Sequence, residues 1–320
     1  MRVVLQIFIQ NILPIFILVT LGYLVSRKFQ LDTGTLNKIN FWLFVPAFTF
    51  TNLYVTDIGL DALRALAVAV LILVANLLAG FLIARIRHYR NGLGNAFQNA
   101  IAFYNSGNIG IPLITLVFSS GAFLIDGRTP YLDVALTTQI MVLVVQNVSV
   151  NTIGFFNAGR ANRHWKDAVK TVVGMPAIYA VTAAFLLKLV PFDLTATPLW
   201  PALTYLKNGL VPIALTILGI QLAKTKFRIN DRTAWLAVFL RLVGGPLLAL
   251  LFIRLFGISG VVAQALLISS AVPTAVNSAL VALECDNHPE FATQVVVLST
   301  LFGSITLIGV IFMASRLFPV

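Results

Sequence analysis

The sequence predicts an all-α, polytopic membrane protein with ten transmembrane helices arranged as a 5+5 inverted repeat. Of its 320 residues, 59% are hydrophobic and only 10% are charged, whereas about a quarter of the residues in a soluble domain are charged. Apolar stretches long enough to cross ~30 Å of hydrocarbon recur along the whole chain. The net charge is +11. In a membrane protein, basic residues gather in cytoplasmic loops, where they meet anionic lipid headgroups, so no nucleic-acid partner is expected.

Ten apolar segments are expected to span the membrane, with short connections between them. They cover residues 5–25, 39–55, 62–84, 96–120, 131–155, 171–190, 198–222, 234–256, 260–283 and 291–317. The longest hydrophilic segment predicts a cytoplasmic loop at 157–170, between a first repeat at 1–156 and a second at 171–320. No small-residue cleavage site follows the first apolar segment, so we interpret it as a span and not as a signal peptide.

The distribution of Lys and Arg predicts the orientation, because cytoplasmic loops are enriched in both. Fourteen of these residues fall in loops after odd-numbered helices, and six fall on the other side. This asymmetry predicts a multi-pass protein of the plasma membrane with both termini outside. An odd number of spans in each half would place the two repeats in opposite orientations.

Prolines recur at corresponding places in the two halves of the chain. At offsets of 161 to 166 residues, and in the same order, the pairs are Pro14 with Pro176, Pro46 with Pro212, and Pro112 with Pro273. Inverted repeats with interrupted helices are characteristic of secondary transporters.

Helices 4 and 9 are predicted to be interrupted near mid-membrane and to cross there. Their segments Phe103–Pro112 and Ser269–Ser278 combine Asn, Gly, Ser and Pro, which weaken a helix. Backbone groups freed at that depth must be buried in protein or line a cavity. The expected hinge residues of the crossover are Gly110, Pro112 and Pro273.

The crossover is the predicted ligand site. Half-helices that begin there direct positive N-terminal ends at an anion, but half-helices that end there offer carbonyls that suit a cation, so this geometry leaves the sign of the ligand open. Side-chain hydrogen bonds to the ligand are expected from Asn105, Asn108, Thr274 and Asn277.

Charged residues within the spans favour an anion. All eleven carboxylates fall in loops or at span ends, whereas a proton or sodium site usually places one at mid-membrane. Of the two intramembrane cations, Lys207 is a candidate substrate ligand, and Arg241 is expected to reach the interface beside its basic loop. The three histidines and Cys285 are scattered over loops, so no metal or other cofactor is expected.

Helix 5 carries a polar stripe of Gln139, Gln146, Asn147 and Asn151. These amides serve either as polar contacts between helices or as cavity lining, and the sequence leaves both interpretations open.

Five short motifs, taken in order, make the sequence resemble the auxin efflux carrier family, to which the plant PIN proteins belong. The motifs are Phe44-Val45-Pro46, Asn105 with Gly110-Ile111-Pro112, Val144-Val145-Gln146, Arg241 with Gly245-Pro246, and Glu284 with His288-Pro289. Together they extend the resemblance over essentially the whole chain.

The resemblance implies an elevator-like carrier. Helices 1, 2, 6 and 7 would form a scaffold and the contact of a homodimer, and helices 3–5 and 8–10 would form a moving transport domain. Val45, Asn105 and Gln146 match positions that line the substrate site in plant members. The third span, 62–84, lacks the Asp and Lys that plant members carry there, and the long central loop is missing. Auxin itself is therefore not the expected substrate.

These observations predict a secondary transporter that exports a small organic anion, such as a carboxylate, by alternating access. The alternative is a sodium- or proton-coupled carboxylate importer resembling the bile acid symporters, and an ion channel would differ by showing flux without saturation. An enzyme is not expected, because no span holds His, Asp or Glu near a nucleophile.

Overall fold

A computed structural model describes residues 5, 7–56, 60–90, 92–159, 174–224 and 231–320. Within these ranges the chain forms helices and turns, without a β-strand. Six helices are long and apolar enough to cross a membrane: Phe8–Lys28, Ala62–Ile86, Leu132–Ala158, Leu199–Lys224, Arg232–Leu255 and Pro289–Leu317. The prediction of an all-helical membrane protein is confirmed at this level. The loop predicted at 157–170 lies almost entirely outside the described residues.

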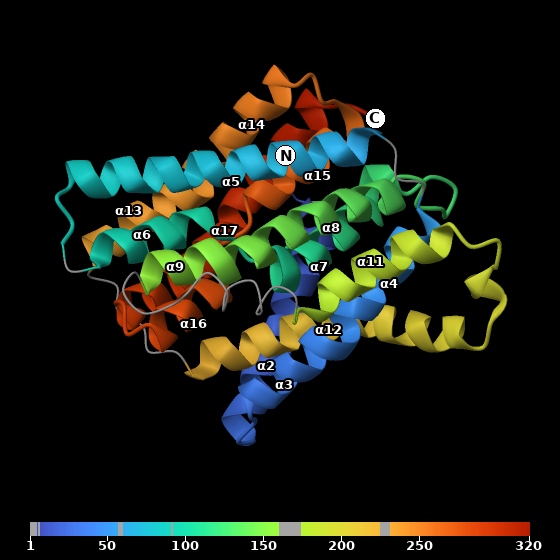
Figure 1. The fold of residues 1–320 in the computed structure, drawn as a ribbon, viewed down its shortest axis with the longest axis horizontal. Helices are drawn as coiled ribbons and strands as arrows, with labels where there is room; N and C mark the ends of the chain where they lie inside the picture. The colour runs from blue at the N-terminus through green and yellow to red at the C-terminus, as the bar shows by residue number, and fades with distance from the viewer. Residues whose placement is uncertain (1–4, 6, 57–59, 91, 160–173, 225–230) are drawn as a thin grey trace.

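The helices form two groups (Figure 1). The smaller group consists of α2 (Leu13–Lys28), α3 (Thr33–Ile39), α4 (Val45–Val55), α11 (Pro176–Lys188) and α12 (Leu199–Lys224). In it, α2 packs along α12, and α4 contacts both α11 and α12.

The larger group surrounds α8. Its members are α5 (Leu60–Ile86), α6 (Leu93–Ala102), α7 (Ile111–Phe118), α8 (Leu132–Ser149), α9 (Phe155–Ala158), α13 (Arg232–Phe239), α14 (Gly245–Leu255), α15 (Gly260–Ser270), α16 (Val276–Glu284) and α17 (Pro289–Leu317). Within it, α5 packs against α6, α8 and α14, and α15 packs against α8, α14 and α17.

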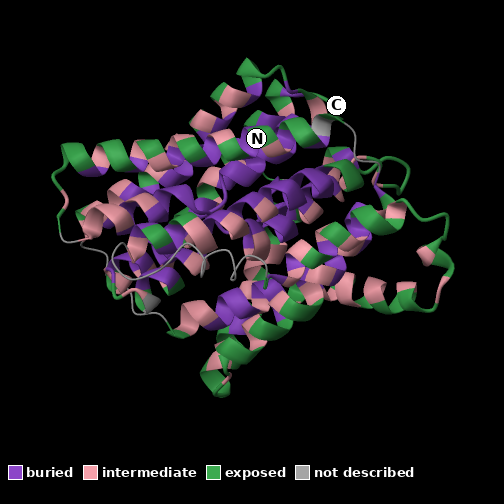
Figure 2. Ribbon diagram, in the orientation of Figure 1, coloured by how far each residue is buried: buried purple, intermediate pink, exposed green. Residues whose placement is uncertain are grey.

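Burial is concentrated where α8 and α15 meet, and the outer helix faces are exposed (Figure 2). In the most apolar stretch of Leu132–Ala158, 67% of the residues are buried, against 17% in that of Phe8–Lys28. The first helix is therefore peripheral, and its exposed leucines and isoleucines are suited to lipid contact.

Four of the π-helical turns in the described chain have one cause. These turns, η1 (Phe8–Ile12), η2 (Asn40–Phe44), η3 (Ser106–Gly110) and η7 (Leu240–Gly244), each lead directly into a helix whose second residue is proline. A proline ring clashes with the carbonyl of the preceding turn, and a wider turn relieves that clash. The helices therefore continue through Pro14, Pro46 and Pro246. A fifth turn, η5 (Val150–Gly154), links α8 to α9 without a proline.

The second predicted helix begins earlier than the sequence suggested. Asp32 caps α3, because its carboxylate accepts hydrogen bonds from the backbone N–H groups of Gly34 at 3.0 Å and Thr35 at 3.1 Å. The helix therefore starts at Thr33, before the membrane span predicted from residue 39.

Two glycines hold α2 and α12 at close range. A Cβ atom on Gly22 would collide with the Thr216 carbonyl, and one on Gly219 would collide with the Val19 carbonyl. In both cases the atom that a Cβ would meet belongs to the backbone of the other helix. A collision there could not be relieved by a change of side-chain rotamer, so the close approach requires glycine.

Candidate functional site

Two helices of the larger group are interrupted, and the interruptions lie against each other. One separates α6, which ends at Ala102, from η3, which begins at Ser106; the other separates α15 from α16 over residues 271–275. The Asn105 N–H donates to the Pro273 carbonyl at 2.8 Å, and the Ala275 N–H donates to the Phe103 carbonyl at 2.9 Å. The two breaks thus satisfy each other's backbone groups within the protein interior.

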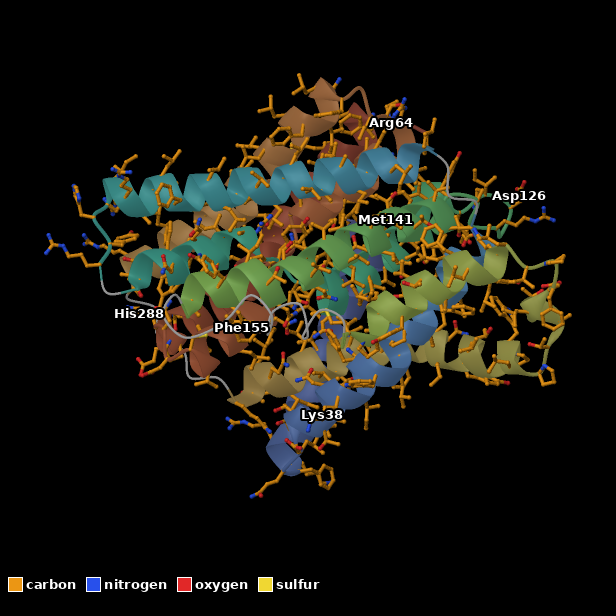
Figure 3. The ribbon with its side chains drawn as sticks, viewed as in Figure 1. Lys38, Arg64, Asp126, Met141, Phe155 and His288 are labelled. Atoms are coloured by element: carbon orange, nitrogen blue, oxygen red, sulfur yellow. The ribbon has the colours of Figure 1, made fainter. Side chains whose placement is uncertain are left out.

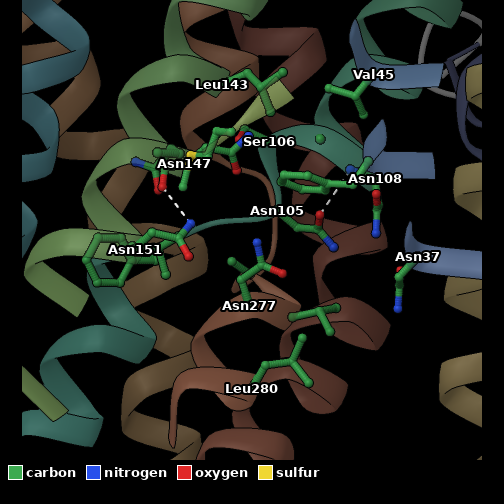
Figure 4. A pocket seen from close by; sticks show the side chains of 18 of the residues that line it. Asn37, Val45, Asn105, Ser106, Asn108, Leu143, Asn147, Asn151, Asn277 and Leu280 are labelled. Atoms are coloured by element: carbon green, nitrogen blue, oxygen red, sulfur yellow. Dashed lines mark hydrogen bonds between the residues drawn. The ribbon is translucent and has the colours of Figure 1, made fainter. Parts of the chain in front are cut away.

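A cavity of about 390 Å³ borders this crossing, a size typical of small-molecule sites. Figure 4 shows side chains converging on it from η3, from the end of α8 and from the first turn of α16. The smaller helix group contributes α3, η2 and the beginnings of α4 and α11. Lys38 on α3 and Phe155 on α9, both in the lining, come from different groups (Figure 3).

Five of the predicted ligand residues line this one cavity: Val45, Asn105, Asn108, Gln146 and Asn277. Two others do not. Thr274 is fully buried, and its hydroxyl donates to the Ala100 carbonyl at 2.9 Å, so it fastens the crossing. Lys207, on α12, is outside the cavity lining and interacts electrostatically with Asp133.

None of the three predicted hinge residues is in the cavity lining, and Pro273 is the one that forms a backbone bond across the crossing. The Pro273 carbonyl accepts from Asn105, and Pro112 is the second residue of α7. Gly110 lies against the Gln139 amide, with no space for a side chain between them.

The orientation of two cavity amides is fixed by backbone donors. The Asn105 Oδ1 atom accepts from the Asn108 N–H at 3.1 Å, and the Gln146 Oε1 atom accepts from the Tyr104 N–H at 3.1 Å. A backbone N–H can only donate, so the side-chain atom facing it must be the oxygen. This leaves Asn105 Nδ2 and Gln146 Nε2 buried without a hydrogen bond of normal geometry, although Gln146 also interacts with the Tyr104 hydroxyl. Both residues border the cavity.

Both interpretations of the polar stripe on the fifth predicted helix apply, each to different residues. Gln139 holds helices together, because its Nε2 donates to the Ser106 carbonyl at 2.7 Å. Gln146, Asn147 and Asn151 line the cavity, and Asn151 donates to the Asn147 carbonyl at 2.8 Å.

The described lining of the cavity carries a positive charge and no negative one. Among the described residues, Lys38 is the cation in the lining, and no carboxylate lies there. The described part of the chain also contains no group of three or more His, Cys, Asp or Glu side chains arranged to hold a metal ion. Lys38 was missed as a site residue because the sequence placed it in a loop.

The prediction for Arg241 is wrong. Its side chain is 0% exposed and does not reach an interface. The guanidinium donates to the Ile101 carbonyl at 2.8 Å and to the Ser270 carbonyl, and it lies over the Tyr104 ring, 4.6 Å from the ring centroid. The spacing of Arg241 before Gly245-Pro246 was the available signal, since Gly245 provides the space beside the guanidinium.

Sequence comparisons relate this chain to known membrane transporters. The profile of a family described as membrane transport protein matches residues 7–166 and 163–311. An uncharacterized transporter of Methanothermobacter thermautotrophicus is 26% identical over 308 residues, which cover 93% of this chain and 95% of that protein.

Proposed function

This chain belongs to the membrane transport protein family, which includes the auxin efflux carriers, and on that premise we propose that it exports a small organic anion, such as a carboxylate. Its assignment as a transporter and not an enzyme, expected from the sequence, is confirmed by the family. The observation that carries the choice of an anion is the pair of buried amide donors, Asn105 Nδ2 and Gln146 Nε2, beside the same cavity.

Several features of the cavity favour a carboxylate as the ligand. Hydrogen bonds to a charged group contribute about 1.5–3 kcal/mol each, and two donors suit the two oxygens of a carboxylate. Val276 and Asn277, in the first turn of α16, border the cavity, and this helix has no side-chain cap. The positive dipole end of this helix therefore also favours an anion. Phe41, Trp42 and Leu143 offer apolar surface for the body of the ligand.

The two helix groups fit an elevator-like mechanism. The amides of Asn105, Gln146 and Asn277 all belong to the larger group, while the smaller group supplies the opposite wall. We assign the smaller group as the scaffold and dimer contact, and the larger group as the moving domain. In this proposal the chain spans the plasma membrane ten times as a 5+5 inverted repeat, with both termini outside. The cavity, beside Lys38 and the segment before α11, then faces the cytoplasm.

Membrane potential is a sufficient driving force for such export. An inside-negative potential contributes about 2.3 kcal/mol per charge per 100 mV, which corresponds to roughly 50-fold accumulation of a monovalent anion outside. No coupled ion is needed for a gradient of this size.

The test is charge movement by purified protein in proteoliposomes, challenged with a panel of mono- and dicarboxylates at controlled pH and sodium. We expect a saturable current of negative charge that is indifferent to both cation gradients. Asn105→Asp keeps the acceptor for the Asn108 N–H but replaces the free donor with negative charge. It should weaken apparent anion affinity about tenfold or more.

The matched control is Gln30→Glu, which adds the same charge at an exposed position outside the cavity. Equal kinetics of Asn105→Asp and this control would refute the site. Currents that vanish without sodium or a proton gradient would select the coupled importer, and flux without saturation would select a channel.

A further inference from the structure

The crossing contains a buried positive charge that the cavity lining does not include. Arg241 is 0% exposed and forms no ion pair with a carboxylate among the described residues. A buried charge is costly unless polar groups replace its hydration. Here two backbone carbonyls and the face of Tyr104 take that role for the terminal nitrogens, while the buried Nε makes no hydrogen bond.

The two carbonyls belong to the ends of two different half-helices. Ile101 lies in the last turn of α6, and Ser270 is the last residue of α15. One guanidinium therefore bridges the C-terminal ends of both interrupted helices. Each such end carries about half a negative elementary charge, so the two ends together balance approximately one cation.

The neighbouring carbonyls of α6 are already satisfied by other donors. The Asn99 carbonyl accepts from the Phe103 N–H, and the Ala100 carbonyl accepts from the Thr274 hydroxyl. Arg241 supplies the donor for the next carbonyl, that of Ile101. Without the guanidinium, the Ile101 and Ser270 carbonyls would face each other unpaired in the interior, an arrangement that suits a hard cation.

Gly245 provides the space that the Arg241 guanidinium occupies. A Cβ atom on Gly245 would collide with the guanidinium. Gly245 and Pro246 lie one helical turn after Arg241, where the π-helical turn η7 ends and α14 begins. The position of the guanidinium therefore depends on a glycine on its own helix.

We propose that Arg241 is a built-in cation at the crossing, which occupies the carbonyl site that a coupling ion would need and supplies its charge permanently. Tyr104 separates the guanidinium from the cavity, because its ring lies under Arg241 while the residue also borders the cavity. The charge acts on the substrate site without contacting the substrate. This inference rests on the proposed transport of an anion, and it explains why no sodium ion or proton needs to accompany that anion.

The first test uses purified Arg241→Ala and needs no substrate. Its apparent melting temperature is measured while guanidinium, sodium or potassium chloride is added at millimolar concentration. We expect a saturable rise of at least about 3 °C with guanidinium, because a cation that binds only the folded state stabilises it. The wild type should show no such rise, and neither should Arg254→Ala, which removes an exposed cation from the same span, Arg232–Leu255.

The second test is uptake in proteoliposomes with and without sodium. Wild-type transport should be indifferent to sodium, and Arg241→Ala should lose transport and regain it with guanidinium or sodium. Gly245→Ala should also lower transport, because it moves the guanidinium away from the two carbonyls although Arg241 itself is retained. A sodium requirement in the wild type would overturn the proposal, as would sodium-independent transport by Arg241→Ala at the wild-type rate.

The two proposals fail separately. If Asn105→Asp leaves anion affinity unchanged, the anion site is wrong while cation binding to Arg241→Ala can still be measured. If Arg241→Ala does not yield folded protein, the wild-type sodium test and Gly245→Ala still decide the question of the built-in cation.

Discussion

Tyr104 and Thr274 face each other across the crossing as an antiparallel bridge. Their side chains have different contacts: the Tyr104 ring lies under Arg241, and the Thr274 hydroxyl donates to the Ala100 carbonyl. The Tyr104 N–H also donates to Gln146, which borders the cavity. Backbone pairing at one point thus connects the buried charge, the helix ends and the cavity amides.

Replacement of Gln146 should separate its two roles. Gln146→Glu keeps the acceptor for the Tyr104 N–H and removes the free donor, so it should weaken anion affinity about tenfold with little loss of stability. Gln146→Leu also leaves the buried Tyr104 N–H unpaired, which costs a further ~1–3 kcal/mol. Transport kinetics and thermal unfolding measure the two effects. If both variants unfold at the same temperature, the bond to Tyr104 has no structural role.

Thr274→Val should destabilise the protein without changing its affinity for the substrate. The substitution preserves the shape of the side chain but removes the donor to the Ala100 carbonyl, at a cost of ~1 kcal/mol or more. Thr274→Ser retains the hydroxyl and is the control. Apparent melting temperature and the KM of transport are measured together. A raised KM with an unchanged melting temperature would return Thr274 to the substrate site.

The two lysines should behave differently. Lys38 borders the cavity but is exposed, so Lys38→Gln should raise the KM for the anion only a few-fold, and less at high salt. Lys207→Gln should leave KM unchanged, because Lys207 lies outside the lining. Initial transport rates at two ionic strengths measure both. The opposite ranking would show that the anion passes α12.

Gly22→Ala should disrupt the contact between α2 and α12. The added methyl group collides with the Thr216 backbone, and overpacking of this kind costs about 1–3 kcal/mol or more. Gly309→Ala is the matched control, since no atom lies within 4 Å of its added Cβ. Thermal unfolding in detergent, with size-exclusion profiles, measures the difference. Equal stability of the two variants would contradict the close approach of these helices.

Acid should weaken the cap of α3. Hydrogen bonds from the Thr35 hydroxyl and from the Gly34 and Thr35 N–H groups hold the pKa of Asp32 below its ordinary value of 3.8. A lowered pKa contributes stability above pH ~4, and this contribution is lost as the pH falls through the folded-state pKa. Asp32→Asn removes that part of the pH dependence while retaining a capping oxygen. Melting temperatures between pH 3 and 7 compare the two proteins, and parallel curves would contradict the shift.

The interruptions were predictable because they depend on local chemistry. Asn105 and Gly107 are weak helix formers beside one break, and Pro273 lies within the other. The sequence also identified five residues that line the cavity. The widened turns before Pro14, Pro46 and Pro246 were not predicted. A π-helical turn shifts the phase of the helix by one residue, but spans that are apolar on most sides show no polar stripe in which that shift could be recognised.

The positions that sequence reasoning placed wrongly depend on neighbours distant in the chain. Arg241 stays buried because the carbonyls of Ile101 and Ser270, on two other helices, accept its hydrogen bonds. Thr274 points to Ala100, although its neighbour Asn277 borders the cavity. Sequence patterns indicate the depth of a residue in the membrane, but not which partner helix its side chain meets.

The backbone bonds between the two breaks have a consequence for the diversity of such carriers. The bonds of Asn105 to Pro273 and of Ala275 to Phe103 use main-chain atoms only, so they do not depend on side-chain identity at most of these positions. The crossing of the two interrupted helices can therefore stay unchanged in evolution while the amides around the cavity are substituted. A descendant that acquires a new cargo then needs a few substitutions in the lining, and its helices need not be rebuilt.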